Sequence, residues 1–90
     1  MGVRRTKIEI IYDILTAIQK KGGRIKPTHL LYKSNLSYKK MLEYVGELMS
    51  KDMVGEEEEK GKKMYTLTDK GSNYIQEFKK IKEFSDSFGL

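Results

Sequence analysis

A capped, amphipathic stretch in the middle of the chain limits the folds that this sequence can adopt. Residues 35–54 read NLSYKKMLEYVGELMSKDMV, and Ser37 is suited to cap a helix over 37–51. The apolar residues recur at helical spacing, and they are Tyr38, Met41, Leu42, Val45, Leu48 and Met49. The charged residues fall on the opposite side, and they are Lys39, Lys40, Glu43 and Glu47. One face, with Tyr38 near its centre, is therefore expected in a core, and the other is free to meet a partner.

Capping and helix-breaking residues divide the preceding part of the chain into short elements. Thr6 and Glu9 form a capping-box pattern, and Gly22-Gly23 ends the helix that they begin. Pro27 opens a brief second helix, and Ile25 before it is suited to a minimal strand. Leu36, just before the Ser37 cap, is expected to be a buried plug. The expected core residues of these elements are Ile8, Ile11, Ile14, Leu15, Ile18, Leu30, Leu31 and Leu36.

The period of the sequence changes after residue 52. Residues 53–59 and 63–68 read as two strands around a glycine turn, which predicts a hairpin. Tyr65 and Leu67 share one side of the second strand and are expected to point inward. The run Glu56–Glu59 is expected to lie mostly in solvent, where a charged edge also discourages aggregation.

The last helix carries an apolar row that its own domain is not expected to cover. Thr68-Asp69 caps this helix. Its predicted core stripe comprises Tyr74, Ile75, Phe78 and Ile81. Beyond that stripe the apolar row changes side, and it then comprises Ile81, Phe84 and Phe88. A second copy of the chain is the expected cover, and a frayed end with stray aromatics is the alternative.

These elements predict one domain over residues 1–90, of the mainly α (α+β) class. The expected boundaries are 1–5 for a flexible basic arm, 6–21 for the first helix, 27–34 for the second, 37–51 for the third, 53–67 for the hairpin and 68–88 for a C-terminal dimerisation helix.

Charge favours a polyanionic partner once it is placed along the chain. The net charge is +5, but Glu56–Glu59 holds four of the thirteen acids, so the rest carries 18 basic against nine acidic residues, or +9. Such an excess favours nucleic acid, through phosphate contacts and counterion release. A plain solubilising surface is the alternative.

Composition excludes several other classes of function. His29 is the only histidine and there is no cysteine, so we expect His29 to be exposed and non-catalytic, with phosphate contact as the alternative. No nucleophile has a plausible base and no glycine-rich loop enters a helix, so we expect no enzyme, metal, cofactor or small-molecule ligand. No apolar run approaches the roughly 20 residues that span a bilayer, and the N-terminus is unlike a signal peptide, so we expect a soluble, cytoplasmic protein.

Three segments, in order and at their spacing, relate the chain to a known family. They are Lys7-Ile8-Glu9-Ile10-Ile11, Asn35-Leu36-Ser37-Tyr38 and Tyr65-Thr66-Leu67-Thr68-Asp69-Lys70-Gly71. With its order of elements, the chain resembles the small archaeal winged-helix DNA-binding proteins, the roughly ten-kilodalton chromosomal-protein type that dimerises through a C-terminal coiled coil. The resemblance spans nearly the whole chain.

The resemblance implies a winged helix-turn-helix fold, with a three-helix core, a two-stranded wing and a C-terminal helix. It also implies a homodimer that places the third helix of each subunit in a DNA groove and the wing on the adjacent backbone. The sequence departs from the family in two places. The C-terminal helix stops at Leu90, so we expect a weaker or differently arranged dimer, and Glu56–Glu59 would repel phosphates if it faced them.

The prediction is therefore a homodimeric DNA-binding protein, acting as a transcription regulator or as a nucleoid-associated architectural protein. Its partners are double-stranded DNA and a second copy of the chain. The candidate DNA-binding residues are Ser37, Lys39, Lys40, Lys60, Lys62, Lys63, Lys33, Arg4 and Arg5. The candidate dimer residues are Ile81, Phe84 and Phe88.

Three alternatives remain open at this point. In the first, the outer face of the third helix is solvated and self-paired, through Glu43 with Lys39 and Glu47 with Lys51. In the second, the N-terminal arm is a frayed basic end. The third alternative is a protein-interaction module that has this fold and no intrinsic DNA binding, and the acidic run and the aromatic row favour it.

Overall fold

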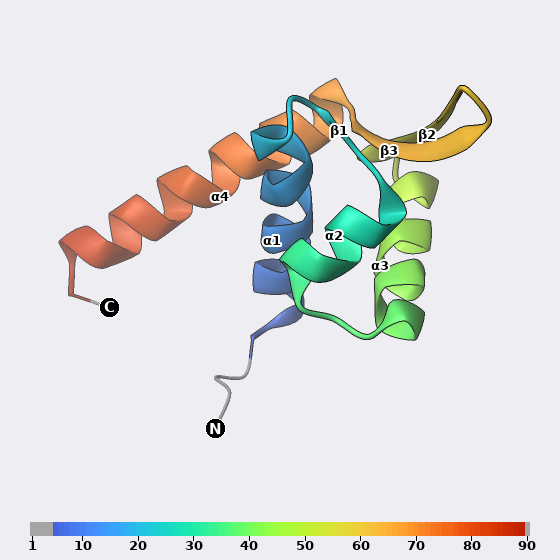
Figure 1. Cartoon of the computed structure of the whole chain (residues 1–90). Coiled ribbons are helices and arrows are strands. Elements are labelled where there is room, and N and C mark those ends of the chain that lie inside the picture. Colours follow the sequence, from blue (N-terminus) through green and yellow to red (C-terminus); the bar gives the residue numbers. More distant parts are fainter. Residues whose placement is uncertain (1–4, 90) are drawn as a thin grey trace.

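The computed structural model describes residues 5–89, which form four helices and a three-stranded antiparallel sheet (Figure 1). Their order is α1 (Lys7–Lys20), β1 (Arg24–Ile25), α2 (Pro27–Ser34), α3 (Tyr38–Ser50), β2 (Val54–Glu59), β3 (Lys62–Leu67) and α4 (Asp69–Ser87). This order confirms the predicted fold class, with β2 and β3 as the wing. The strand predicted at Ile25 is β1, which pairs with β3, so the sheet order is β1-β3-β2.

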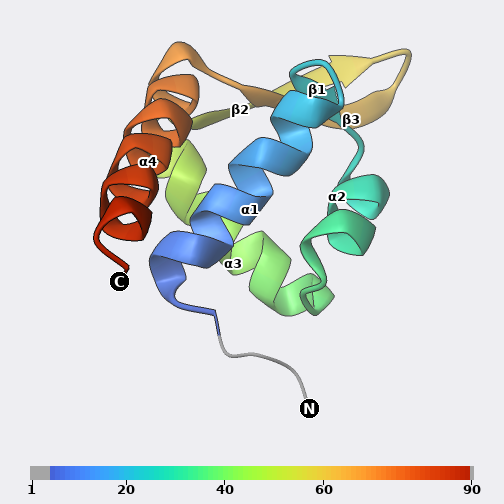
Figure 2. The same ribbon diagram turned by 90° about the vertical axis from the view of Figure 1, so that its left-hand side faces the viewer.

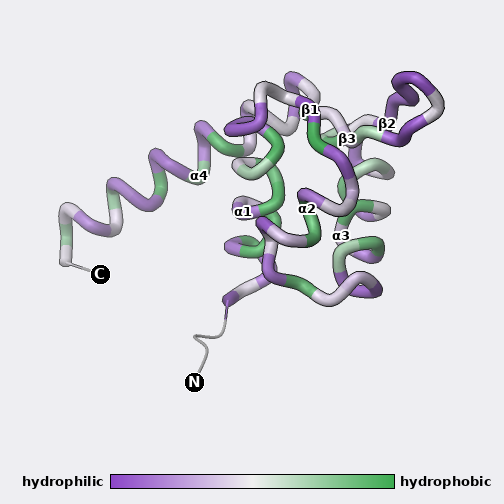
Figure 3. Tube along the Cα trace, viewed as in Figure 1, coloured by the Kyte–Doolittle hydropathy of each residue, from purple (hydrophilic) through white to green (hydrophobic). Residues whose placement is uncertain are grey.

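The core lies between the helices and the inner face of the sheet. In Figure 2 α1 crosses the centre of the molecule, with α4 and α2 on either side and the sheet at one end. Figure 3 shows the apolar residues concentrated along α1 and α3, whereas the tip of the wing is hydrophilic. The buried apolar residues are Ile11, Ile14, Leu15, Ile18, Ile25, Leu30, Met41, Val45, Leu48, Val54, Tyr65 and Ile75.

The capping pattern at the start of α1 is confirmed atom by atom. The Thr6 hydroxyl oxygen accepts a hydrogen bond from the Glu9 N–H at 3.2 Å, and the Glu9 carboxylate accepts one from the Thr6 N–H at 3.0 Å. The prediction of Ile8 as a core residue is wrong, because its side chain is 55% exposed. Ile8 lies in the first turn of α1, in an open groove that Phe78 and Ile81 of α4 also line.

Helix α2 and the turn after it follow the sequence closely. Leu30 is fully buried, and Leu31 packs half-buried against the core. Asn35 ends the helix in the left-handed region, at a φ of 55° that asparagine tolerates better than most residues. Leu36 packs against the core but is half-buried, so it is not the fully buried plug that we expected.

The buried face of α3 is narrower than its apolar pattern predicts. Met41, Val45 and Leu48 are at most 1% exposed, but Tyr38 is 58% and Leu42 41% exposed. The three buried residues recur at a four- and a three-residue interval, so they form one narrow strip along the helix. Tyr38 and Leu42 lie one turn apart on the flank of that strip. The placement of Tyr38 in the core was therefore wrong.

The wing is a regular hairpin, and the backbone of its two-residue turn matches the right-handed twist of the two strands. Its register runs from the pair Val54 and Leu67 to the pair Glu59 and Lys62. The two turn residues between the strands, Lys60 and Gly61, have φ values of 52° and 78°. As predicted, Tyr65 points inward and is 2% exposed, and Leu67 is half-buried.

A compact junction joins the wing to α4. The Thr68 hydroxyl accepts a hydrogen bond from the Gly71 N–H at 3.0 Å and donates one to the Asp52 carbonyl at 2.6 Å. Gly71 is buried against the backbone of Met53, where a Cβ atom would overlap the Met53 carbonyl oxygen. The junction thus fixes where the wing begins relative to the last helix.

Helix α4 is anchored at its first half and leaves the body of the molecule at its second (Figure 1). Ile75 is fully buried, and Phe78 stacks on Tyr12 of α1 with ring centroids 4.4 Å apart. Ile81 was placed in the core stripe as well as in the outer row, and its 65% exposure places it in the outer row alone. Beyond Phe78 the helix diverges from α1, and the two helices leave an open groove between them (Figure 1).

Candidate nucleic-acid interface

The first turn of α3 presents a capped helix end with two lysines in solvent. The Ser37 hydroxyl oxygen accepts a hydrogen bond from the Lys40 N–H at 3.2 Å, as the capping pattern predicts. Lys39 and Lys40 are both exposed. Within residues 5–89, Lys39 forms no ion pair, whereas the Lys40 Nζ lies 3.7 Å from a carboxylate oxygen of Glu43. The helix N-terminus, with its free backbone N–H groups, is thus flanked by one free and one paired cation.

The two acids of α3 do not form the pairs that we expected within the helix. Glu43 pairs with Lys40 and not with Lys39. The Glu47 Oε1 accepts a hydrogen bond at 2.9 Å from the Nζ of Lys7, which belongs to α1 and not to α3. This hydrogen bond lowers the pKa of Glu47 and raises the pKa of Lys7. Within the described residues Glu47 forms no ion pair with Lys51, so its partner comes from another helix.

An exposed apolar pair lies beside these lysines, and the periodicity of α3 did not reveal it. Tyr38 and Leu42 occupy the same flank of α3 one turn apart. Tyr38 is the first residue of α3, and the chain enters β2 from the other end of this helix, so the pair lies toward the end of α3 that is farther from the sheet (Figure 1). The position of Tyr38 directly after the cap residue is the one sequence signal that marks it as a boundary residue.

The tip of the wing carries free positive charge, and ion pairs offset about half of the charge of its acidic strand. Lys60 and Lys62 are exposed and have no ion-pair partner in the described part of the chain, whereas Lys63 lies 3.5 Å from Glu56. Arg24 of β1 bridges the carboxylates of Glu57 and Glu59 at 3.1 and 2.9 Å. The role of Arg24 was missed because its reach to β2 depends on the β1-β3-β2 strand order, which no local pattern encodes. As predicted, the run Glu56–Glu59 is exposed to solvent.

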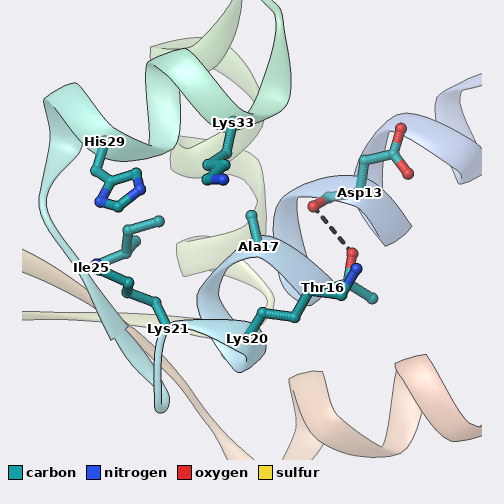
Figure 4. A pocket seen from close by; sticks show the side chains of 8 residues that line it. All are labelled: Asp13, Thr16, Ala17, Lys20, Lys21, Ile25, His29 and Lys33. Atoms are coloured by element: carbon teal, nitrogen blue, oxygen red, sulfur yellow. Dashed lines mark hydrogen bonds between the residues drawn. The ribbon is translucent and has the colours of Figure 1, made fainter.

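The remaining candidate phosphate contacts are scattered. Arg5, which we expected in a flexible arm, is instead held against the domain: its guanidinium lies 2.9 Å from the Asp13 carboxylate and donates to the Asn35 carbonyl at 3.4 Å. Arg4 lies outside the described residues. Lys33 projects from α2 into a cleft that it shares with His29, and not toward the first turn of α3 (Figure 4).

The three candidate dimer residues form one exposed row on the projecting half of α4. Ile81, Phe84 and Phe88 are 65%, 66% and 65% exposed, and the rings of the two phenylalanines are 4.9 Å apart. Beside this row runs the groove between α1 and α4, about 460 Å³ in volume, to which Ile8 contributes its exposed side chain. Ile81 belongs both to the row and to the lining of this groove, so the two apolar features adjoin.

The described residues contain no group of three potential metal-ligating side chains. No helix between residues 5 and 89 is both long and apolar enough to cross a membrane.

His29 was expected in solvent, and this was wrong: it is half-buried in the cleft between α1 and α2.

Comparison with known proteins identifies the class that this fold defines. The model of the winged helix-turn-helix family matches residues 4–86, so the chain belongs to that family. Over 80 residues it is 33% identical to the uncharacterized protein MJ0290 of Methanocaldococcus jannaschii, which covers 89% of this chain. The chain spans only 35% of the length of that relative.

Two solved structures of similar size share the fold. One is Sso10a-2, a DNA-binding protein from Sulfolobus solfataricus, with a TM-score of 0.75 and 27% identity over 94% of this chain and 90% of that one. The other is F93 from STIV, a winged-helix DNA-binding protein, with a TM-score of 0.71 and 22% identity over 91% and 92% of the two chains. The predicted resemblance to small archaeal winged-helix proteins is thereby confirmed.

Proposed function

We propose that the chain is a single winged-helix domain that binds duplex DNA as a homodimer, in the role of a transcription regulator or of a chromosome-associated architectural protein. The observation that carries the proposal is the capped N-terminus of α3, which meets solvent beside Lys39, a lysine that forms no ion pair within residues 5–89. The likeness to Sso10a-2 supports DNA as the partner.

In this proposal the first two turns of α3 enter the major groove, as in other helix-turn-helix proteins. The Ser37 hydroxyl and the free backbone N–H groups hold a phosphate, and Lys39 and Lys40 contact the backbone or base edges. The exposed pair Tyr38 and Leu42 then meets the groove with apolar surface, which suits a thymine methyl group or a sugar.

The wing contributes its tip and not its strands. Lys60, Lys62 and Lys63 contact the neighbouring phosphates from the turn and the start of β3. The carboxylate nearest to the turn in the chain, that of Glu59, is occupied by Arg24 at 2.9 Å. The salt bridges of Arg24 to Glu57 and Glu59 reduce the repulsion that the acidic run exerts on DNA. They also weigh against the alternative in which this run is a docking site for a partner protein, since Arg24 and Lys63 already offset two of its four negative charges.

A second copy of the chain is the proposed cover for the exposed row Ile81, Phe84 and Phe88. In Figure 1 the projecting half of α4 and the wing lie at opposite ends of the molecule. Pairing through α4 therefore leaves both wings and both α3 helices free, and it doubles the number of phosphate contacts of a single weak site.

The proposal is tested by replacing the two lysines of α3. Lys39→Gln with Lys40→Gln should weaken binding of a generic duplex in fluorescence anisotropy and should flatten its dependence on salt. Lys70→Gln with Lys79→Gln is the matched control, because it removes the same charge from α4. If both double variants lose affinity equally, net charge explains the loss and α3 is not the contact surface.

A further inference from the structure

A cleft between α1 and α2 combines an apolar wall with a basic rim (Figure 4). Its volume is about 410 Å³. Ala17 and the aliphatic stem of Lys20 supply apolar surface, since Ile25, which also lines the cleft, is only 1% exposed. The basic side chains around the cleft are Lys20, Lys21, His29 and Lys33. Cavities of this size suit small organic molecules, which they hold by apolar contact and a few polar groups.

The sequence builds this cleft through the spacing of its residues. His29 and Lys33 are four residues apart on α2, so they lie on one face of that helix, and in Figure 4 both project into the cleft. Lys20 and Lys21 approach from the C-terminal end of α1. One turn earlier Ala17 presents only a methyl group, which leaves the space open.

The cleft has a positive charge that the rest of the described chain does not neutralise. Lys20, Lys21 and Lys33 form no ion pair with any residue between 5 and 89, and the nearest acid in the lining, Asp13, is held by Arg5 at 2.9 Å. Partial burial lowers the pKa of His29, and the charges of Lys21 and Lys33 lower it further. The imidazole is therefore largely neutral at pH 7 and faces two uncompensated ammonium groups.

We propose that this cleft binds a small aromatic carboxylate, with the ring on Ala17 and the aliphatic stem of Lys20 and the carboxylate between Lys21, His29 and Lys33. The apolar surface distinguishes this ligand from a bare inorganic anion, which gains nothing from it. The recess between two helices distinguishes it from a phosphate of duplex DNA. The free lysines of the proposed DNA surface lie on α3 and on the wing tip.

The single histidine of the chain makes the test direct. The imidazole proton resonances of His29 are followed in NMR pH titrations with benzoate, with acetate and with inorganic phosphate, all at one ionic strength. Benzoate should raise the pKa of His29 in a saturable manner and at lower concentration than acetate or phosphate, because only benzoate has both the charge and the ring. Equal effects of the three anions, or shifts that do not saturate, would overturn the proposal.

Two double variants connect the effect to the cleft. Lys21→Gln with Lys33→Gln should raise the pKa of His29 without any ligand and should weaken benzoate binding by about five- to tenfold, the range expected for two exposed charged contacts. Lys70→Gln with Lys79→Gln, of equal charge, should behave like the wild type. A duplex that shifts the His29 resonances while benzoate does not would assign the cleft to DNA and refute the small-ligand site. This test is independent of whether the domain binds DNA.

Discussion

Replacing Gly71 with alanine should destabilise the protein, although alanine is the better helix former. At this buried position in the first turn of α4, a Cβ atom would overlap the Met53 carbonyl oxygen and lie 2.8 Å from the Cδ1 of Leu67. The helix-propensity gain is at most about 1 kcal/mol and is smaller in a first turn. Overpacking against backbone costs about 1–3 kcal/mol, so the net loss of stability is expected to be about 1–2 kcal/mol.

The same substitution at Gly46 is the matched control. Gly46 lies within α3, and a Cβ atom there would meet no atom within 4 Å. Gly46→Ala should therefore stabilise the domain by about 0.5–1 kcal/mol through helix propensity alone. Both variants are measured by urea unfolding followed by far-ultraviolet circular dichroism, with the denaturant slope checked for constancy.

The two substitutions are expected to shift the unfolding midpoint in opposite directions. We predict a higher unfolding midpoint for Gly46→Ala and a lower one for Gly71→Ala. Stabilisation of similar size at both positions would mean that α4 does not pack against the Met53 backbone. The junction that places the wing would then be wrong.

Three further outcomes follow from the proposed interface and from the ion pairs. Lys60→Gln with Lys62→Gln should lower the slope of log K against log[salt] for duplex binding by roughly 2 per subunit, and an unchanged slope would remove the wing tip from the DNA contact. Phe84→Asp with Phe88→Asp should yield a monomer in sedimentation, whereas a persistent dimer would place the interface elsewhere. The depressed pKa of Glu47 means that its stabilising effect is present above the ordinary value of 4.5 and is lost as the pH falls through the lowered pKa. The thermal midpoints of wild type and Glu47→Gln should therefore differ at pH 7 and converge in acid, and a constant gap would show that the ion pair is not the cause.

Local signals in the sequence were sufficient to predict the helices, the strands and their order along the chain. The Thr6–Glu9 box, the Ser37 cap and the Lys60-Gly61 turn each depend on residues close together in the chain, and each is found in the structure. The segment around Thr68 and Gly71, which carried part of the family resemblance, has a structural role. Thr68 links α4 to the end of α3, and Gly71 permits close packing on the wing.

The errors share one physical cause, which is that periodicity gives the direction of a side chain but not how far its neighbours extend. Ile8 and Tyr38 both lie in the first turn of a helix, at the edge of the surface that covers it, so apolar spacing placed them inside. Ile81 was misplaced for a related reason, because the second half of α4 projects from the body of the molecule (Figure 1). The pairing of Lys7 with Glu47 joins residues 40 positions apart, and no local pattern predicts it.

Titration of the wild-type protein with a generic DNA duplex at low and moderate salt tests the central claim most directly. Lys39, Lys60 and Lys62 have no ion-pair partner within residues 5–89, so a dimer presents six such lysines to DNA. We predict binding at low salt that weakens as salt is added, with a slope of log K against log[salt] of about −5. Absence of detectable binding at low salt would contradict the proposed function.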